Sequence, residues 1–330
     1  MCSLFGILNY ANNLNKEQIN TIIKVLASEC EARGIDATGI AYNNENRLTV
    51  YKRPLPSYKI KFNVPSGVNT VMGHTRLTTQ GLQKYNFNNH PFVGHCGNTN
   101  YALAHNGIIY NDEILRDKHN LKDTQIQTDT YIAVQLINEN KSLDFKSIAK
   151  SVEELEGYFT FTILDDENNL YMVKGESPLA IYHFKKYGFY IYASTKEILN
   201  KALDRLGLSK LKYSEIKLFE GDILKISNKG KLSEYEYTPN DFLNLLSYGY
   251  GSYSYDRSGT KSQKSNADNM ECSYYKIIVE YARGLGFEKK EIDQLINAGF
   301  EIEFIEELLN DPDELSMYIS YITSGGDVYA

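Results

Sequence analysis

The chain has 330 residues, of which 42% are hydrophobic, enough for one large domain with a smaller addition or for two domains. Its net charge of −7 at pH 7 argues against a general nucleic-acid binder and against a protein of anionic membrane surfaces. Its four cysteines are scattered without a CxxC pair, and the apolar run at residues 4–10 is too short for a signal peptide or a membrane span. We therefore expect free thiols in a reducing compartment, the cytoplasm.

The first third of the chain has the pattern of strands around one amphipathic helix. Residues 2–9 form an apolar run that predicts a buried strand. Apolar side chains then recur at three- and four-residue spacing over 15–33, which predicts a helix that Gly34 ends, with Cys30 in its core-facing stripe. Three short strands and a long loop rich in Asn, Gly and Gln should follow, at 37–43, 47–54, 69–75 and 77–100.

The middle of the chain alternates between strand-like and helical segments. A strand at 101–105 should lead into a turn, and helices are expected at 128–139 and 144–154. The remaining elements should be strands at 157–165, 169–174, 179–184 and 188–193, a helix at 195–206, and closing strands near 214–225 and 231–237. Strand-rich runs framed by helices predict a layered α+β domain.

The composition changes near residue 239. Residues 247–268 are rich in Ser, Gly and Tyr, which predicts a flexible linker. Residues 271–330 carry 4 Lys/Arg against 13 Asp/Glu, a surface that would repel phosphates, and their apolar residues have helical spacing. We therefore divide the chain into a main domain at 2–240, a linker at 241–270 and a small acidic helical module at 271–330, which we expect to dock on a partner or on the main domain.

Cys2 would be the first residue of the chain once Met1 is removed, a processing step that is usual before a small second residue. An N-terminal cysteine carries a thiol nucleophile and a potential base, its own α-amine, on one residue. A free α-amine titrates near ~8, so it can accept a proton at neutral pH. The position therefore predicts a nucleophile, although a cysteine at position 2 can also be accidental.

Five further clusters follow Cys2, and each alone would usually mark only a helix end or a turn. Their order after Cys2 is what predicts a site. They are Arg33-Gly34-x-Asp36-x-x-Gly39, Gly73-His74-Thr75-Arg76-x-x-Thr79-x-Gly81, Asn89-His90-Pro91-Phe92, Ala104-His105-Asn106-Gly107-Ile108-x-x-Asn111 and Thr128-Asp129-Thr130.

Attack on the side-chain amide of glutamine would account for most of these residues. The α-carboxylate of the substrate favours a bidentate cation, for which Arg76 is the candidate, and the α-ammonium favours a carboxylate, for which Asp129 is the candidate. The tetrahedral intermediate needs donors for its oxygen, and Asn106 and Gly107 could supply a side-chain NH₂ and a backbone N–H. Asn-Gly is also the commonest hairpin turn, so a purely structural interpretation of that pair stays open.

With these motifs the sequence resembles the class II glutamine amidotransferases, which are N-terminal-nucleophile hydrolases. The family patterns are an N-terminal Cys-Gly/Ser-Ile/Leu-Phe/Val-Gly-Ile, RGxD(S/A)xG, GHTRxAT, NxHP or NxQP, HNGxIxN and SDTE. They correspond here to Cys2–Ile7, Arg33–Gly39, Gly73–Thr79, Asn89–Pro91, His105–Asn111 and Thr128–Thr130. The likeness continues weakly to about residue 225 and so covers roughly two thirds of the chain.

The resemblance implies a fold and a set of roles. The fold is a four-layer αββα sandwich. Cys2 would be the nucleophile and its freed amine the general base, with Asn106 and Gly107 as the oxyanion hole. Arg76 and Asp129 would hold the two charged ends of the substrate, with help from Thr79. Glutamate and ammonia would form through a γ-glutamyl thioester, without cofactor or metal.

Three positions depart from the family pattern. Leu77 replaces a Trp or Tyr, Thr78-Thr79-Gln80 replaces Ala-Thr-His, and Tyr131 replaces the final acid of SDTE. None removes a group that the chemistry requires, but they bear on selectivity for glutamine and on loop closure.

The histidines have no catalytic role in this chemistry. His74, His90 and His105 lie inside the motifs and are expected to be buried hydrogen-bonding groups. The spacing of His90, His95 and Cys96 matches no standard zinc pattern, so we expect no metal site. Cys96 and Cys272 are expected to be incidental.

The tail after residue 240 is too short for a sugar isomerase or a phosphoribosyltransferase domain, and Ser324-Gly325-Gly326-Asp327 lacks the strand–helix frame of a pyrophosphate loop. Three functions stay open. The first is a glutaminase that passes ammonia to a separate ligase or synthase, with the acidic module as docking element. The second is a hydrolase of another γ-glutamyl amide or peptide, which His90-Pro91-Phe92 would also fit. The third is a catalytically silent module that binds a ligand.

Overall fold

A computed structural model describes residues 2–45 and 47–240 and, beyond these, 275, 278–279, 282–283, 285–298, 300, 305, 308–309 and 312–323. The chain divides into two compact units, Met1–Tyr248 and Gly249–Ala330. The predicted linker at 241–270, Cys272 and Ser324–Asp327 lie outside the described residues. Among the described residues, no helix combines the length and the apolar character needed to cross a membrane.

The first unit contains a seven-stranded antiparallel sheet in the order β11-β9-β10-β1-β4-β2-β3. The central strand β1 pairs with β10 on one side and with β4 on the other. The strands of this sheet are β1 Ser3–Leu8, β2 Ala37–Asn44, β3 Arg47–Arg53, β4 Thr70–Arg76, β9 Ala180–Phe184, β10 Phe189–Ala193 and β11 Ser214–Ile216.

A six-stranded antiparallel sheet, in the order β13-β12-β8-β7-β6-β5, packs against the first. Its longest strand, β6, pairs with β7 over its last nine residues. The strands of this sheet are β5 Phe92–Cys96, β6 Thr99–Ile109, β7 Gly157–Asp165, β8 Leu170–Lys174, β12 Asp222–Ile226 and β13 Leu232–Glu236.

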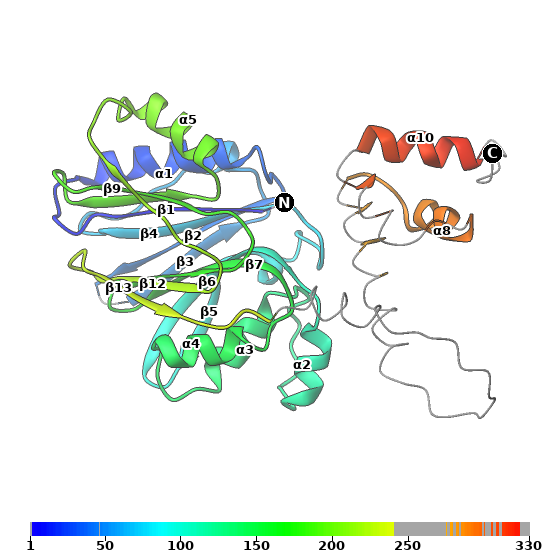
Figure 1. The fold of residues 1–330 in the computed structure, drawn as a ribbon. Helices are drawn as coiled ribbons and strands as arrows, with labels where there is room; N and C mark the ends of the chain where they lie inside the picture. The colour runs from blue at the N-terminus through cyan, green and yellow to red at the C-terminus, as the bar shows by residue number, and fades with distance from the viewer. Residues whose placement is uncertain are drawn as a thin grey trace. The chain divides into compact units, whose positions relative to one another are not determined.

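Helices cover the outer faces of both sheets, so the unit has four layers (Figure 1). The helices α1 Lys16–Cys30 and α5 Lys196–Leu206 lie on the first sheet, and α3 Tyr131–Asn138 and α4 Phe145–Val152 lie on the second. Alternate residues of β1 explain the layering, because Phe5 packs with the core under α1 and Leu4 packs with the core between the sheets. The expected αββα sandwich is confirmed.

The helix α1 illustrates how local sequence sets an element. The side chain of Asn15 accepts a hydrogen bond from the N–H of Gln18, and the side chain of Gln18 accepts one from the N–H of Asn15. The two bonds form a capping box at the N-terminus. Ile19, Ile23 and Cys30 are buried on one face, as the spacing predicts. The helix nevertheless ends at Cys30, three residues before the predicted boundary.

The structure corrects three predictions for the middle of the chain. The strand predicted at 101–105 does not turn there but continues as β6 to Ile109. The predicted loop at 77–100 contains the edge strand β5 and a 3₁₀ turn at Asn86–Asn88. The predicted strand at 214–225 is two strands in different sheets, since β11 pairs with β9 whereas β12 pairs with β8. A short helix, α2 Asp112–Lys118, was not predicted.

The second unit has a core of its own. Its described helices include α8 Lys289–Asn297 and α10 Pro312–Thr323. Ile292 and Leu295 of α8 and Leu315 of α10 are buried in one apolar cluster, which agrees with the helical spacing of the sequence.

Candidate functional site

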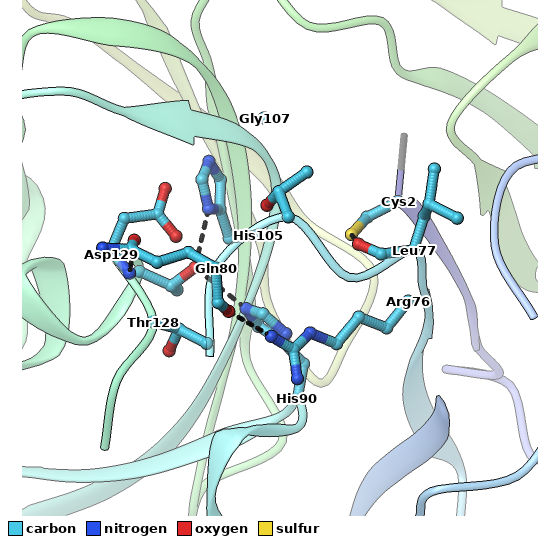
Figure 2. A pocket seen from close by; sticks show the side chains of 11 residues that line it. Cys2, Arg76, Leu77, Gln80, His90, His105, Gly107, Thr128 and Asp129 are labelled. Carbon is cyan, nitrogen blue, oxygen red and sulfur yellow. Dashed lines mark hydrogen bonds between the residues drawn. The ribbon is translucent and has the colours of Figure 1, made fainter. Parts of the chain in front are cut away.

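Cys2 directly precedes the central strand of the first sheet and lines a pocket of the first unit (Figure 2). Its thiol donates to the backbone carbonyl of Leu77 at 3.4 Å, and its own carbonyl accepts from Nε of Arg33 at 3.0 Å. Burial raises the pKa of the Cys2 thiol, so the sulfur is protonated at neutral pH and needs a base to become a nucleophile. The pocket is lined by Cys2, Arg76, Leu77, Thr79, Gln80, His90, His105, Gly107, Thr128, Asp129 and Thr130.

Arg76 ends β4 and supplies the cation of the pocket. Its Nη1 donates to Oδ1 of Asn89 at 2.8 Å, and its Nη2 donates to the backbone carbonyls of Gln80 and of Gly81, the latter at 2.8 Å. Burial lowers the pKa of the guanidinium, but an arginine stays charged at neutral pH. The side chain is thus held from several directions while remaining on the pocket wall.

Asp129 supplies the carboxylate on another part of the same pocket. Its Oδ2 accepts from the N–H of Ile109 at 2.7 Å, and its own N–H donates to Oε1 of Gln80 at 2.8 Å. Burial raises the pKa of the carboxyl group, whereas the hydrogen bond from Ile109 and the charge of Arg76 lower it. A cation and a carboxylate in one small pocket match the two charged ends of an amino acid.

Gln80 contacts both charged residues, because its carbonyl accepts from Arg76 and its side chain accepts from the backbone of Asp129. Figure 2 shows its side chain between the two. The sequence assigned Gln80 no role. Its only signal was that it departs from the histidine of the family pattern.

Asn106 and Gly107 lie within β6, opposite Thr160 and Phe159 of β7, so the hairpin-turn interpretation of this pair is wrong. Gly107 has φ 141°, and a Cβ there would lie 1.7 Å from the carbonyl oxygen of Tyr158, so only glycine fits. Gly107 lines the pocket. The neighbouring Asn106 side chain is buried, and its Nδ2 has no hydrogen-bond partner. A buried donor without a partner next to the pocket is what an oxyanion hole requires.

The Arg33–Gly39 cluster hydrogen-bonds to the backbone of residues that line the pocket. The N–H of Asp36 donates to the carbonyl of Arg76 at 2.9 Å, and its Oδ2 accepts from the N–H of Thr78 at 2.7 Å. Arg33 holds the carbonyl of Cys2. This cluster therefore fixes the start of the segment at 77–81 and the position of the nucleophile rather than lining the pocket.

The three motif histidines are buried hydrogen-bonding groups, as expected. Nε2 of His74 lies 2.9 Å from the carbonyl of His105, so it carries the proton of that hydrogen bond. Burial lowers the pKa of His74 and of His105 to about 3 and that of His90 well below its ordinary value. All three are neutral at physiological pH. Across the described residues, no group of three His, Cys, Asp or Glu side chains is arranged to hold a metal ion.

Part of the chain is similar to a family of known proteins. The family described as "Glutamine amidotransferase domain" matches residues 74–201. The glutamine–fructose-6-phosphate aminotransferase (isomerizing) of Campylobacter jejuni is 31% identical over 247 residues, which cover 69% of this chain and 39% of that protein. Its counterpart in Geobacillus kaustophilus is 27% identical over 238 residues, 69% of this chain and 36% of that protein.

A solved structure shares the fold. Glutamine phosphoribosylpyrophosphate amidotransferase from B. subtilis, complexed with ADP and GMP, superposes with a TM-score of 0.57 over 72% of this chain and 49% of that one, at 22% identity. The chain thus spans less than half the length of each of these three proteins.

Proposed function

We propose that this chain, which belongs through its N-terminal unit to the class II glutamine amidotransferases, hydrolyses the side-chain amide of glutamine to glutamate and ammonia. The observation that carries the proposal is the pocket itself, in which a thiol, a guanidinium and a carboxylate face one space. These groups belong to Cys2, Arg76 and Asp129.

Binding would use the two charged walls of the pocket. Arg76 would hold the α-carboxylate, with Thr79 beside it, and Asp129 would hold the α-ammonium. Because Nη2 of Arg76 already donates to the carbonyls of Gln80 and Gly81, the substrate carboxylate would replace these bonds. The segment at 77–81 would therefore shift when glutamine enters.

The chemistry would proceed through a thioester on Cys2. The α-amine freed by removal of Met1 takes the thiol proton, and sulfur attacks the amide carbon to form a tetrahedral oxyanion. Asn106 Nδ2 and the N–H of Gly107 stabilise that oxyanion. Its collapse breaks the C–N bond, and the proton held on the amine leaves with the nitrogen as ammonia. Water then attacks the γ-glutamyl thioester, with the amine again as base, and glutamate leaves.

Glutamate release from glutamine tests this function, provided that the mass of the intact protein shows Met1 to be absent. Two analogues sharpen the test, since glutaramate lacks the α-ammonium and 4-aminobutanamide lacks the α-carboxylate. A charged hydrogen bond is worth about 1.5–3 kcal/mol, so each analogue should lose about 10- to 150-fold in kcat/KM. Processed protein that releases no glutamate, or that turns over all three amides equally, would contradict the proposal. Faster turnover of γ-glutamyl amides than of glutamine would favour the second candidate function.

We further propose that the ammonia passes to a separate cytoplasmic ligase or synthase and that the acidic second unit, 249–330, docks that partner. A pull-down with the full chain should capture a protein that a chain ending at residue 240 does not capture. With glutamine as the nitrogen source, that protein should aminate its acceptor only when the full chain is present. With an ammonium salt as the nitrogen source, it should do so without the chain. Capture by both chains, or a captured protein that cannot use ammonium, would contradict the proposal.

A further inference from the structure

The hydroxyl of Thr130 lies between two imidazoles of the pocket lining. Its Oγ1 is 3.0 Å from Nε2 of His90 and 2.8 Å from Nδ1 of His105. All three side chains are at most 4% exposed. Neither the family likeness nor the proposed chemistry gives Thr130 a role.

Each of the three residues is next in the chain to a group that holds the substrate or supports such a group. Thr130 follows Asp129, and His105 precedes Asn106. His90 follows Asn89, whose Oδ1 accepts from Nη1 of Arg76. One hydroxyl therefore connects the segments that carry the ammonium ligand, the oxyanion donors and the support of the guanidinium.

The protons of this contact allow two kinds of arrangement. Both imidazoles are neutral because burial lowers their pKa values, so each has one N–H and one bare nitrogen. The hydroxyl has one proton and two lone pairs. It can donate to one imidazole while it accepts the N–H of the other, or it can donate to the Asp129 carboxylate, whose pKa it lowers, and accept an N–H from both imidazoles. A serine could do the same, whereas a valine of the same shape could do neither.

We propose that Thr130 is a positioning residue that fixes the Asp129 turn, the Asn106–Gly107 strand and the Asn89–His90 support of Arg76 relative to one another. This inference rests on the proposed glutamine hydrolysis. It predicts that loss of the hydroxyl disturbs binding and catalysis together, because both ends of the pocket lose the same anchor.

Thr130→Val and Thr130→Ser test the role of the hydroxyl. Since a displacement of about 1 Å in a site can cost about 100-fold, Thr130→Val should lower kcat/KM for glutamine by roughly that factor, with a higher KM and a lower kcat. Thr130→Ser should stay within about threefold of the unchanged protein. Thr70, at the far end of β4 from Arg76, is also buried, and Thr70→Val is the matched control that should keep full activity.

A second measurement needs no variant and covers the case in which Thr130→Val does not fold. Long-range ¹H–¹⁵N spectra of the unchanged protein should show a proton on at least one of His90 Nε2 and His105 Nδ1. Bare nitrogens at both positions would overturn the bridge, because the single hydroxyl proton can bond to only one of them. The combination of Thr130→Val with Asn89→Ala should raise KM by less than the product of the single effects, because both act on Arg76.

The outcomes separate this inference from the proposed function. If the unchanged protein hydrolyses glutamine and Thr130→Val does so equally well, the inference fails and the proposed function stands. If the unchanged protein releases no glutamate, the proposed function fails, and the imidazole spectra still decide whether Thr130 bridges the two rings.

Discussion

Replacing Cys2 with alanine is expected to lower glutamine hydrolysis by at least about 10⁴-fold and to leave the fold unchanged. Loss of a nucleophile removes the covalent route entirely, and in well-studied hydrolases it costs about 10⁴- to 10⁶-fold. The side chain is only partly buried and lies outside the apolar clusters, and its thiol donates only at 3.4 Å to the carbonyl of Leu77. Glutamate release, together with an unfolding curve in urea, measures both expectations.

The pH dependence of the unchanged protein should identify the base. Burial raises the pKa of the Cys2 thiol above its ordinary value, so a thiolate is not available at pH 7 without help. An α-amine titrates near ~8, and only its neutral form accepts a proton. The value of kcat/KM should therefore rise as pH increases from 6 and level off above about 8. A chain that carries an uncleaved residue before Cys2 should be nearly as inactive as Cys2→Ala.

Cys96 provides the matched thiol control. It lies in β5, where its sulfur donates to the carbonyl of Asn140 at 3.4 Å, and it is absent from the pocket lining. Cys96→Ala should retain glutaminase activity, and incubation with an electrophilic glutamine analogue should label it at Cys2. Substantial hydrolysis by Cys2→Ala, or labelling at another cysteine, would show that the thioester mechanism is wrong.

The sequence predicted that the nucleophile, the cation and the acid of the pocket lie together, because their residue types and their order along the chain indicate their chemistry. Cys2, Arg76 and Asp129 are a nucleophile, a cation and an acid inside separate motifs, and the structure brings them to one pocket. The apolar run at residues 2–9 likewise predicted β1, because a strand buried on both faces is apolar along its whole length. Their exact roles stay predictions until the variants are measured.

Contacts that depend on tertiary structure could not be predicted in this way. The Asn106–Gly107 pair has a strong local preference for a hairpin turn, yet nine residues of ladder with β7 hold it in a strand. Gln80 and Thr130 owe their contacts to partners 25 to 49 positions away, and no local pattern encodes such distances. The boundary between β11 and β12 was missed because only a short segment, 217–221, separates them, although they belong to different sheets.

Asn106→Ala is expected to lower kcat by about 10²- to 10³-fold with little change in KM, since an oxyanion donor acts mainly on the transition state. The same variant should lose little free energy of unfolding, despite the large loss of kcat. Nδ2 of Asn106 is buried without a partner, and a buried unpaired donor costs about 1–3 kcal/mol in the free protein. Removal of this unpaired donor stabilises the folded protein and offsets the packing contacts that are lost with the longer side chain. The free energy of unfolding should therefore stay within about 1 kcal/mol of the unchanged value.

Asn43, which does not line the pocket, is a buried asparagine whose side-chain NH₂ does have hydrogen-bond partners. Its Nδ2 donates to the carbonyl of Asp165 at 2.7 Å and to Oδ1 of Asn168 at 3.1 Å. Asn43→Ala removes both hydrogen bonds, while the Asp165 carbonyl keeps the N–H of Asn168 at 3.2 Å. The loss should lower the free energy of unfolding by about 1–3 kcal/mol while kcat is kept. Urea unfolding and steady-state kinetics on both variants give the comparison. If Asn106→Ala lost stability like Asn43→Ala and kept its kcat, Asn106 would be a structural residue and the oxyanion would need another donor.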